Sequence, residues 1–183
     1  MSMRFMDRVK LENKKNIGIL GGTFDPAHVG HIKISKIAKK QFKLNQVIWA
    51  ITNKNPFKKK SSRSLKVRIK YAKNINLKNR FIKIGFYEKN IKSNKTIDLI
   101  KYFIKNNKNS NIYFIMGADN LINFHKWKKS NQILNLCKIL VFDRDGYKTK
   151  SLKSPSFKKY NKKGINFIKF KKVNISSSQL RKI

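Results

Sequence analysis

The stretch "NIGILGGTFDPAHVGHIKISKIAKKQF", residues 16–42, contains the pattern that decides the fold. An apolar run of strand length at 16–20 is followed by a loop containing glycine and histidine, and then by apolar residues at helical spacing. The predicted order is strand, loop, helix. The helix would bury one face and leave its lysines to solvent, and that face consists of Ile32, Ile34, Ile37, Ala38 and Phe42.

Similar apolar runs recur along the rest of the chain, at 46–51, 81–86, 111–116, 138–142 and 166–170, and a second strong helical pattern covers 96–107. Strands that alternate with helices predict an α/β fold with a mostly parallel sheet of five to six strands and helices on both faces. Such sheets bind ligands beyond the carboxyl ends of their strands, at a topological switch point. The loop at 21–31 falls there.

The length of 183 residues favours one domain, predicted over 16–183, with residues 1–15 as an N-terminal extension whose composition allows disorder. Two lysine- and serine-rich segments, 52–64 and 144–164, lack periodicity and are predicted to be loops with few core contacts. No apolar run is long enough to span a membrane and the first residues lack a secretory signal, so a cytoplasmic location is expected.

Charge is the most extreme property of the composition, with 45 Lys and Arg against 8 Asp and Glu and a net charge of +37. A positive field attracts any polyanion, so a basic nucleic-acid-binding module is one function to consider. The lysines are spread along almost the whole chain together with asparagine and isoleucine, which A+T-rich codons favour. The sequence therefore predicts no specific nucleic-acid partner.

The loop at 21–31 has the features of an anion site. Gly21 and Gly22 would let the backbone turn tightly and approach a ligand closely. The helix is predicted to start near Gly30, where unpaired N–H groups favour phosphate. His28 and His31, three residues apart, can point the same way into that site. Two other interpretations remain open at this point: histidines that only cap or fill space, and a zinc pair with a third ligand elsewhere.

The same eleven residues, "GGTFDPAHVGH", resemble the HxGH signature of the nucleotidylyltransferase superfamily. From about residue 17 to residue 181 the chain resembles the bacterial nicotinate-nucleotide adenylyltransferases. The motifs that carry the resemblance are "NPFK" at 55–58, "VRIKYAK" at 67–73, "KTIDLI" at 95–100, "MGADNLINFHKWKKSNQI" at 116–133 and "ISSSQLR" at 175–181. The resemblance implies a Rossmann-like nucleotidylyltransferase fold and an enzyme that transfers AMP from ATP to nicotinate mononucleotide.

The resemblance also implies roles for individual residues. His28 and His31 would donate hydrogen bonds to the transferring and leaving phosphates, and Arg181 would fork onto the same oxygens, so these three are the predicted catalytic residues. Mg²⁺ would be bound with ATP, and no protein metal ligands are predicted. The implied ATP-binding residues are Gly21, Gly22, Thr23, Phe24, His28, Gly30, His31, Gly117, Asp119, Ile175, Ser176, Ser177, Ser178 and Arg181.

The acceptor would be bound by Asn53, Lys58, Thr96 and Trp127, with Trp127 as a platform for the pyridine ring and Thr96 near the nicotinate carboxylate. Arg68 is a further candidate phosphate partner. Without the resemblance, Trp127 would be interpreted as an ordinary core tryptophan and Asp119 as an acidic helix cap. Nicotinamide mononucleotide or another phosphorylated acceptor remains an alternative substrate, and the sequence does not indicate an oligomeric state.

Overall fold

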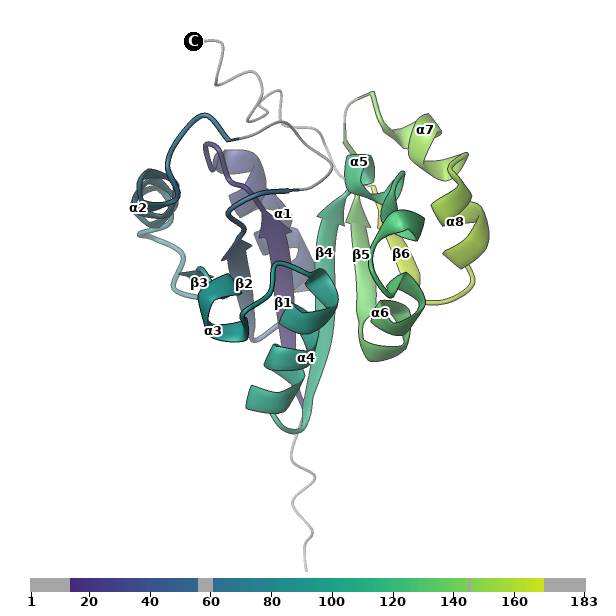
Figure 1. Ribbon diagram of the computed structural model, residues 1–183, viewed down its shortest axis with the longest axis horizontal. Coiled ribbons are helices and arrows are strands. Elements are labelled where there is room, and N and C mark those ends of the chain that lie inside the picture. Colours follow the sequence, from purple (N-terminus) through teal and green to yellow (C-terminus); the bar gives the residue numbers. More distant parts are fainter. Residues whose placement is uncertain (1–13, 56–60, 145, 170–183) are drawn as a thin grey trace, which may run out of the picture.

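The computed structural model describes residues 14–55, 61–144 and 146–169. In these ranges the strands form a single parallel sheet in the order β3-β2-β1-β4-β5-β6 (Figure 1). The strands are β1 (Lys15–Gly22), β2 (Gln46–Ile51), β3 (Ile82–Gly85), β4 (Ser110–Gly117), β5 (Lys138–Phe142) and β6 (Ile165–Ile168). The prediction of a mostly parallel, Rossmann-like sheet is confirmed, and β1 starts one residue inside the predicted extension.

The helices connect successive strands and cover both faces of the sheet (Figure 1). They are α1 (Val29–Gln41), α2 (Leu65–Ile75), α3 (Glu88–Ile91), α4 (Thr96–Asn106), α5 (Ala118–Leu121), α6 (Ser130–Leu136), α7 (Lys148–Leu152) and α8 (Pro155–Tyr160), with a 3-10 turn at Phe124–Lys126. None of the helices in the described ranges is long and apolar enough to cross a membrane.

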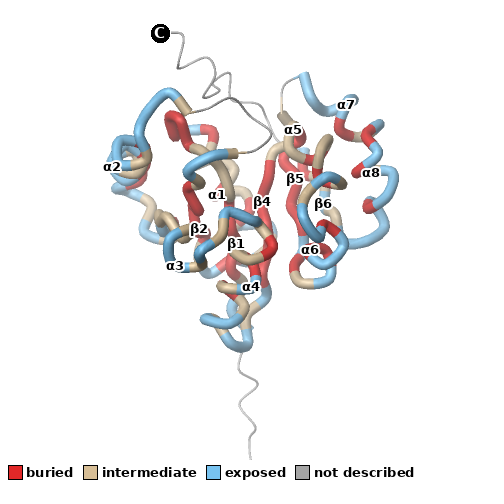
Figure 2. Tube along the Cα trace, in the orientation of Figure 1, coloured by how far each residue is buried: buried red, intermediate tan, exposed pale blue. Residues whose placement is uncertain are grey.

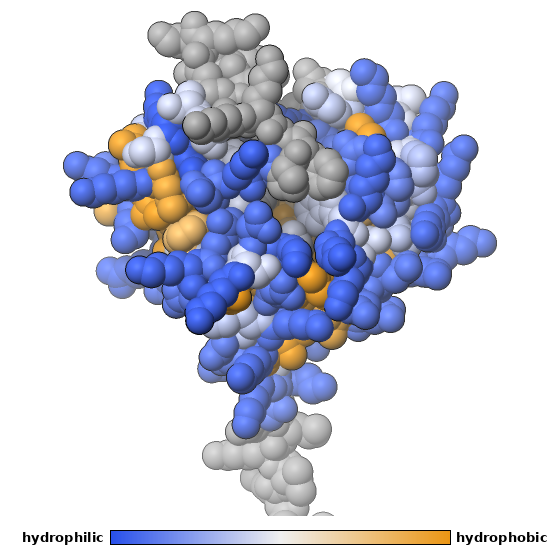
Figure 3. All heavy atoms as spheres, in the orientation of Figure 1, coloured by the Kyte–Doolittle hydropathy of each residue, from blue (hydrophilic) through white to orange (hydrophobic). Residues whose placement is uncertain are grey.

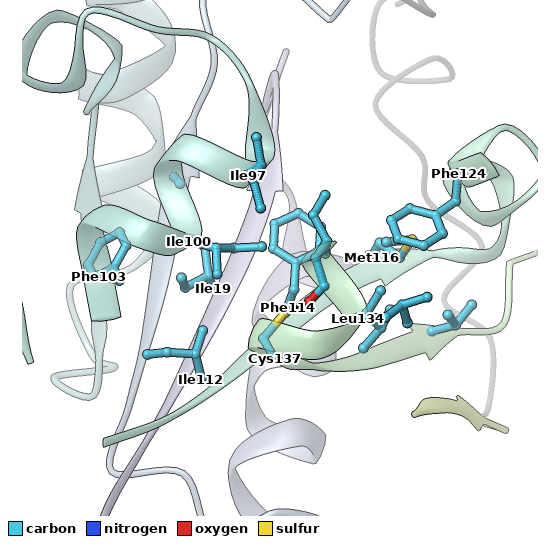
Figure 4. Close-up of a cluster of buried hydrophobic side chains, with 14 of the residues drawn as sticks. Ile19, Ile97, Ile100, Phe103, Ile112, Phe114, Met116, Phe124, Leu134 and Cys137 are labelled. Carbon is cyan, nitrogen blue, oxygen red and sulfur yellow. Dashed lines mark hydrogen bonds between the residues drawn. The ribbon is translucent and has the colours of Figure 1, made fainter. Parts of the chain in front are cut away.

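Side chains alternate between the two faces of the sheet, so each face has its own apolar core. Figure 2 shows the strands as mostly buried and the surrounding helices as more exposed. On one face, Ile19 and Phe114 of the sheet pack with Ile97 and Ile100 of α4 and with Leu134 of α6 (Figure 4). On the other face, residues of β1, β2, β4 and β5 pack against α1 and α2. The helical face predicted for α1 lies in this second core, with Ala38 buried and Ile32, Ile34, Ile37 and Phe42 packed against it.

The strand order places the switch point at β1. Its neighbours are β2, from which the chain continues toward one edge, and β4, from which it continues toward the other. The strands are parallel, so the segments that leave β1, β2 and β4 meet at one edge of the sheet. The loop with the histidines is one of these segments, as the sequence predicts.

The prediction that 144–164 is a loop with few core contacts is wrong. The segment contains α7 and α8, and Tyr160 is fully buried with its hydroxyl 3.0 Å from Oγ of Ser130. The start of α8 is set locally, because Ser154 caps it by accepting a hydrogen bond from the Phe157 amide, and Pro155 fits the first helical position. Residues 52–55 and 61–64, the described parts of the other predicted loop, have neither helix nor strand.

Tyr160→Ala should lower the free energy of unfolding by about 3 to 5 kcal/mol, as truncation of a buried aromatic residue does. The ring of Tyr160 packs 5.6 Å from that of Phe124, so the loss would show that the segment belongs to the core. Urea unfolding followed by circular dichroism measures the change. Tyr147→Ala is the matched control, because Tyr147 is 39% exposed in the same segment and should change the value by about 0.5 kcal/mol or less. Equal effects of the two substitutions would contradict the assignment.

Candidate active site at the end of strand β1

Gly21 and Gly22 lie inside β1, paired with Ala50 and Ile51 of β2, and do not form a turn. This corrects the prediction of a tight turn there. The chain turns two residues later, at Phe24, whose φ is 49°. The glycines instead let neighbouring groups approach the backbone closely. Both line the pocket described below, and a Cβ on Gly21 would lie 3.2 Å from the ring of Phe114.

His28 and His31 form the start of α1 through a reciprocal cap. Nδ1 of His28 accepts a hydrogen bond from the Gly30 amide at 3.1 Å, and Nδ1 of His31 accepts one from the His28 amide at 3.2 Å. The two rings lie side by side, with centroids 4.0 Å apart. Because both Nδ1 atoms accept, the neutral form of each ring carries its proton on Nε2. The loop therefore presents two N–H donors beside a helix N-terminus.

Burial and then the positive charge of Arg144 lower the pKa of His28 from 6.5 to about 4. His28 is thus neutral at physiological pH and keeps the tautomer that the cap requires. The ring of His31 packs against the rings of Phe24 and Trp49, at centroid distances of 4.7 and 5.8 Å, and those two rings stack on each other. The sequence predicted that the histidines share one direction, and the geometry adds which nitrogen each one offers.

A cleft of about 300 Å³ opens next to this loop, between the carboxyl ends of β1, β2 and β4 and the start of α4. Of the predicted site residues, Gly21, Gly22, Thr96 and Trp127 line it. The lining also includes four lysines from three separate segments, which are Lys54, Lys95, Lys126 and Lys128. Glu88 is the acidic member of this described lining, so the cleft favours an anionic ligand.

Trp127 is half-buried at the wall of the cleft. Its ring meets Phe114 and Phe124 edge to face, with centroids 6.0 and 5.4 Å away. These contacts fix the ring while part of it stays accessible, as a stacking platform requires. Thr96 is the first residue of α4, and its hydroxyl does not cap the helix. Ser93 instead accepts from the Lys95 amide and donates to Asp98.

Asp119 is the second residue of α5, the short helix that follows β4, and it accepts a hydrogen bond from Nη1 of Arg144 at 2.7 Å. A Cβ on Gly117, two residues earlier, would lie 2.6 Å from Oδ1 of Asp119, so a side chain there would displace this carboxylate. Asp119 lies outside the lining of the cleft, whereas its neighbour Asn120 is part of it. A ribose contact by Asp119 therefore stays a prediction, and its partner Arg144 was not foreseen.

The remaining predicted residues either do not line the cleft or lie outside the described residues. Asn53 is exposed beside the cleft and does not line it, whereas Asn55 does. The structure also corrects the role expected for Arg68, which is buried and donates hydrogen bonds to backbone carbonyls. Lys58 and the motif with Ile175, Ser176, Ser177, Ser178 and Arg181 lie outside the described residues. In the described ranges no group of three His, Cys, Asp or Glu residues is arranged to hold a metal ion.

Comparisons with known proteins agree with this arrangement. The cytidylyltransferase-like family matches residues 19–183. A probable nicotinate-nucleotide adenylyltransferase of Pelagibacter ubique is 63% identical over 172 residues, which cover 94% of this chain and 95% of that protein. The chain belongs to the nicotinate-nucleotide adenylyltransferases of this family. The resemblance seen in the sequence motifs is confirmed.

A more distant member of the family, a probable nicotinate-nucleotide adenylyltransferase of Clostridium novyi, is 36% identical and covers 91% of this chain and 86% of its own. The fold matches that of Plasmodium falciparum nicotinic acid mononucleotide adenylyltransferase complexed with NaAD, with a TM-score of 0.70 at 21% identity. That match covers 92% of this chain and 83% of the other. It supports the Rossmann-like nucleotidylyltransferase fold.

The lowered pKa of His28 predicts a pH-dependent stability. In the unfolded chain the ring titrates near its ordinary value of 6.5, whereas in the folded chain it titrates near 4. Between these values the unfolded state binds the additional proton, so the stabilisation is fully present above about 6.5 and is lost as the pH falls toward 4. His28→Asn keeps a cap acceptor without a titrating ring, so its urea midpoint should fall less between pH 7.5 and 5 than that of the wild type. Parallel pH profiles for the two proteins would contradict the prediction.

Proposed function

We propose that this chain is the enzyme that transfers AMP from ATP to nicotinate mononucleotide, forming nicotinate adenine dinucleotide and pyrophosphate. The observation that carries the proposal is the pair of histidines that cap the start of α1, next to a cleft lined by Thr96 and Trp127. The first element suits phosphates and the second suits a pyridine ring with a carboxylate.

The reaction needs no protein nucleophile. An oxygen of the acceptor phosphate, already ionised at neutral pH, forms a bond to the α-phosphorus of ATP, and the bond from that phosphorus to the bridging oxygen breaks as pyrophosphate leaves. Catalysis then consists of positioning and of charge stabilisation. The Nε2–H groups of His28 and His31 supply two donors for the phosphate oxygens, and neither ring has to gain or lose a proton during the step.

The helix N-terminus beside these donors favours the same negative charge. Arg181 and the serines at 176–178 are proposed to add a second anion site from the C-terminal motif, as the resemblance implies. Mg²⁺ is proposed to enter with ATP, held by the phosphate oxygens, where it offsets negative charge. The predictions of a cytoplasmic location and of no specific nucleic-acid partner remain predictions.

The acceptor is proposed to occupy the lined cleft. Its ring would stack on Trp127, a contact that contributes about 1 kcal/mol beyond burial. The carboxylate would lie near Thr96 at the N-terminus of α4, where backbone N–H groups and the surrounding lysines attract negative charge. A carboxamide has no charge to gain from this environment, so nicotinate should be preferred to nicotinamide.

Incubation with ATP, Mg²⁺ and nicotinate mononucleotide should release pyrophosphate and form the dinucleotide in equal amounts. With nicotinamide mononucleotide, kcat/KM should be lower on the order of tenfold or more, because a charge-assisted interaction worth about 1.5 to 3 kcal/mol is lost. Coupled pyrophosphate detection and chromatography of the product measure both quantities. No product with either acceptor would refute the proposed function, and equal kcat/KM values would refute the acceptor preference.

Replacing His31 with alanine should lower kcat on the order of 10²-fold, as loss of other preorganised donors does, while the change in acceptor KM stays small. His31→Asn provides a stricter test, because a shorter amide can accept from the His28 amide without placing a donor where Nε2 lies. His125→Ala is the matched control, since His125 contacts Ser156 on the α8 side. Near-normal kcat in both His31 variants would contradict the assigned role.

A further inference from the structure

Arg68 is a large cationic side chain at a position that the reaction described above does not use. It belongs to α2 and is 1% exposed, whereas its helix neighbours Lys66, Val67 and Lys70 are exposed. Burial of a guanidinium group is costly unless its N–H groups are paired. The hydrogen-bond partners of Arg68 therefore indicate which segments the side chain holds together.

The guanidinium donates hydrogen bonds to four backbone carbonyls. Nη1 donates to Thr23 at 2.5 Å and to Thr52 at 2.9 Å, and Nη2 donates to Asn53 at 3.2 Å. Nε donates to Arg63 at 3.1 Å, in the segment that leads into α2. Thr23 follows β1 directly, and Thr52 and Asn53 follow β2 directly. One planar group thus joins the ends of two adjacent strands.

Two carboxylates also accept hydrogen bonds at these segments. Asp25, two residues after Thr23, is buried and accepts from the amide of Ser62 at 2.6 Å and from its hydroxyl. Glu88 accepts from the hydroxyl of Thr52 and from the amide of Asn53 at 3.2 Å. Desolvation lowers the pKa of Arg68, and the charges of Asp25 and Glu88 oppose that effect, so the positive charge is balanced within this cluster.

The two joined segments have different tasks in the site. The chain that leaves Thr23 runs through Phe24 to the histidines, while Thr52, Lys54 and Asn55 line the cleft. A direct link between them already exists, because the Thr52 amide donates to the Gly22 carbonyl at 2.9 Å. Arg68 extends this link by one residue on each strand, beyond the point where the sheet ladder ends.

We propose that Arg68 is a positioning residue. It holds the loop that carries His28 and His31, the histidine loop, and the cleft proposed for the acceptor at the distance from each other that adenylyl transfer requires. The inference rests on the proposed function for its catalytic consequence. A rigid fork with donors in fixed directions suits this task, whereas a lysine ammonium has three donors on one atom and cannot span the same carbonyls. A small displacement between the donors and the bound acceptor costs much rate, because an error of about 1 Å can lower it on the order of 10²-fold.

Kinetics of Arg68→Met test the proposal at a temperature where circular dichroism shows the protein folded. We expect kcat to fall on the order of 10²-fold and KM to rise for both ATP and nicotinate mononucleotide, since both sides of the site lose their common support. Arg68→Lys should recover part of kcat. Lys70→Met is the matched control, because it removes one exposed cation from the same helix and should leave both constants within about twofold.

Amide hydrogen exchange gives a readout that needs no turnover. In Arg68→Met, segments 21–28 and 52–55 should both exchange faster than in Lys70→Met, while the central strands keep their protection. If the wild type made no dinucleotide, the proposed function would fail, and exchange would still decide whether Arg68 couples the two segments. Unchanged exchange, or kinetic constants within about twofold of the wild type in folded Arg68 variants, would overturn the proposal.

Ser62→Ala keeps the proposal testable if the Arg68 variants do not fold. Ser62 is exposed, so the substitution should be tolerated, yet its hydroxyl ties Asp25 of the histidine loop to the segment that carries Arg68. The same changes should appear in smaller measure: a lower kcat, higher KM for both substrates, and faster exchange in 21–28. A Ser62→Ala protein identical to the wild type in all three, with unfolded Arg68 variants, would show that the cluster serves stability alone.

Discussion

The hydrogen bond from the Gly30 amide to Nδ1 of His28 is the interaction on which the rest of the site depends. A helix N-terminus needs an acceptor for its free N–H groups, and serine, threonine or aspartate usually supplies one. An aspartate here would bring a negative charge to the proposed phosphate site. A histidine satisfies the helix with one nitrogen and offers a donor with the other. The cap therefore decides both where the helix starts and which tautomer the loop presents.

The same bond explains why the site must be partly buried. A protonated imidazole has no acceptor nitrogen, so protonation of His28 would break the cap as well as add charge. Burial and Arg144 both hold the ring neutral. The aromatic environment of His31, formed by Phe24 and Trp49, belongs to the same arrangement, and Trp49 in turn donates to Ser35, which donates to the His31 carbonyl. The start of α1 is thus linked by these contacts to Phe24 and Trp49 of the second core.

Acidic residues are placed in a way that composition does not reveal. The visible face of the molecule is dominated by hydrophilic side chains (Figure 3), and the net charge is +37. Each acidic residue in the described ranges is buried or half-buried, and all of them lie at the end of the sheet where β1 meets its helix: Asp25, Glu88, Asp98, Asp119 and Asp143. Four of these carboxylates, those of Asp25, Glu88, Asp98 and Asp119, accept hydrogen bonds from a serine, a threonine, a backbone amide or an arginine. The general positive field attracts polyanions of every kind, so selectivity has to come from these fixed contacts.

Short-range patterns were readable from the sequence and long-range pairing was not. The apolar runs gave the strands, and the spacing of Ile32, Ile37 and Ala38 gave the face of α1, because both depend on periodicity alone. The cap of α8 at Ser154 and Pro155 was also a local signal, but lysines and serines around it masked the burial of Tyr160. Arg68 could not be singled out among 45 basic residues, since its partners follow two other strands and accept through backbone carbonyls that any residue possesses. Sequence patterns therefore pointed to the groups proposed to bind phosphates, whereas the groups that hold those loops together become visible only when the fold brings them into contact.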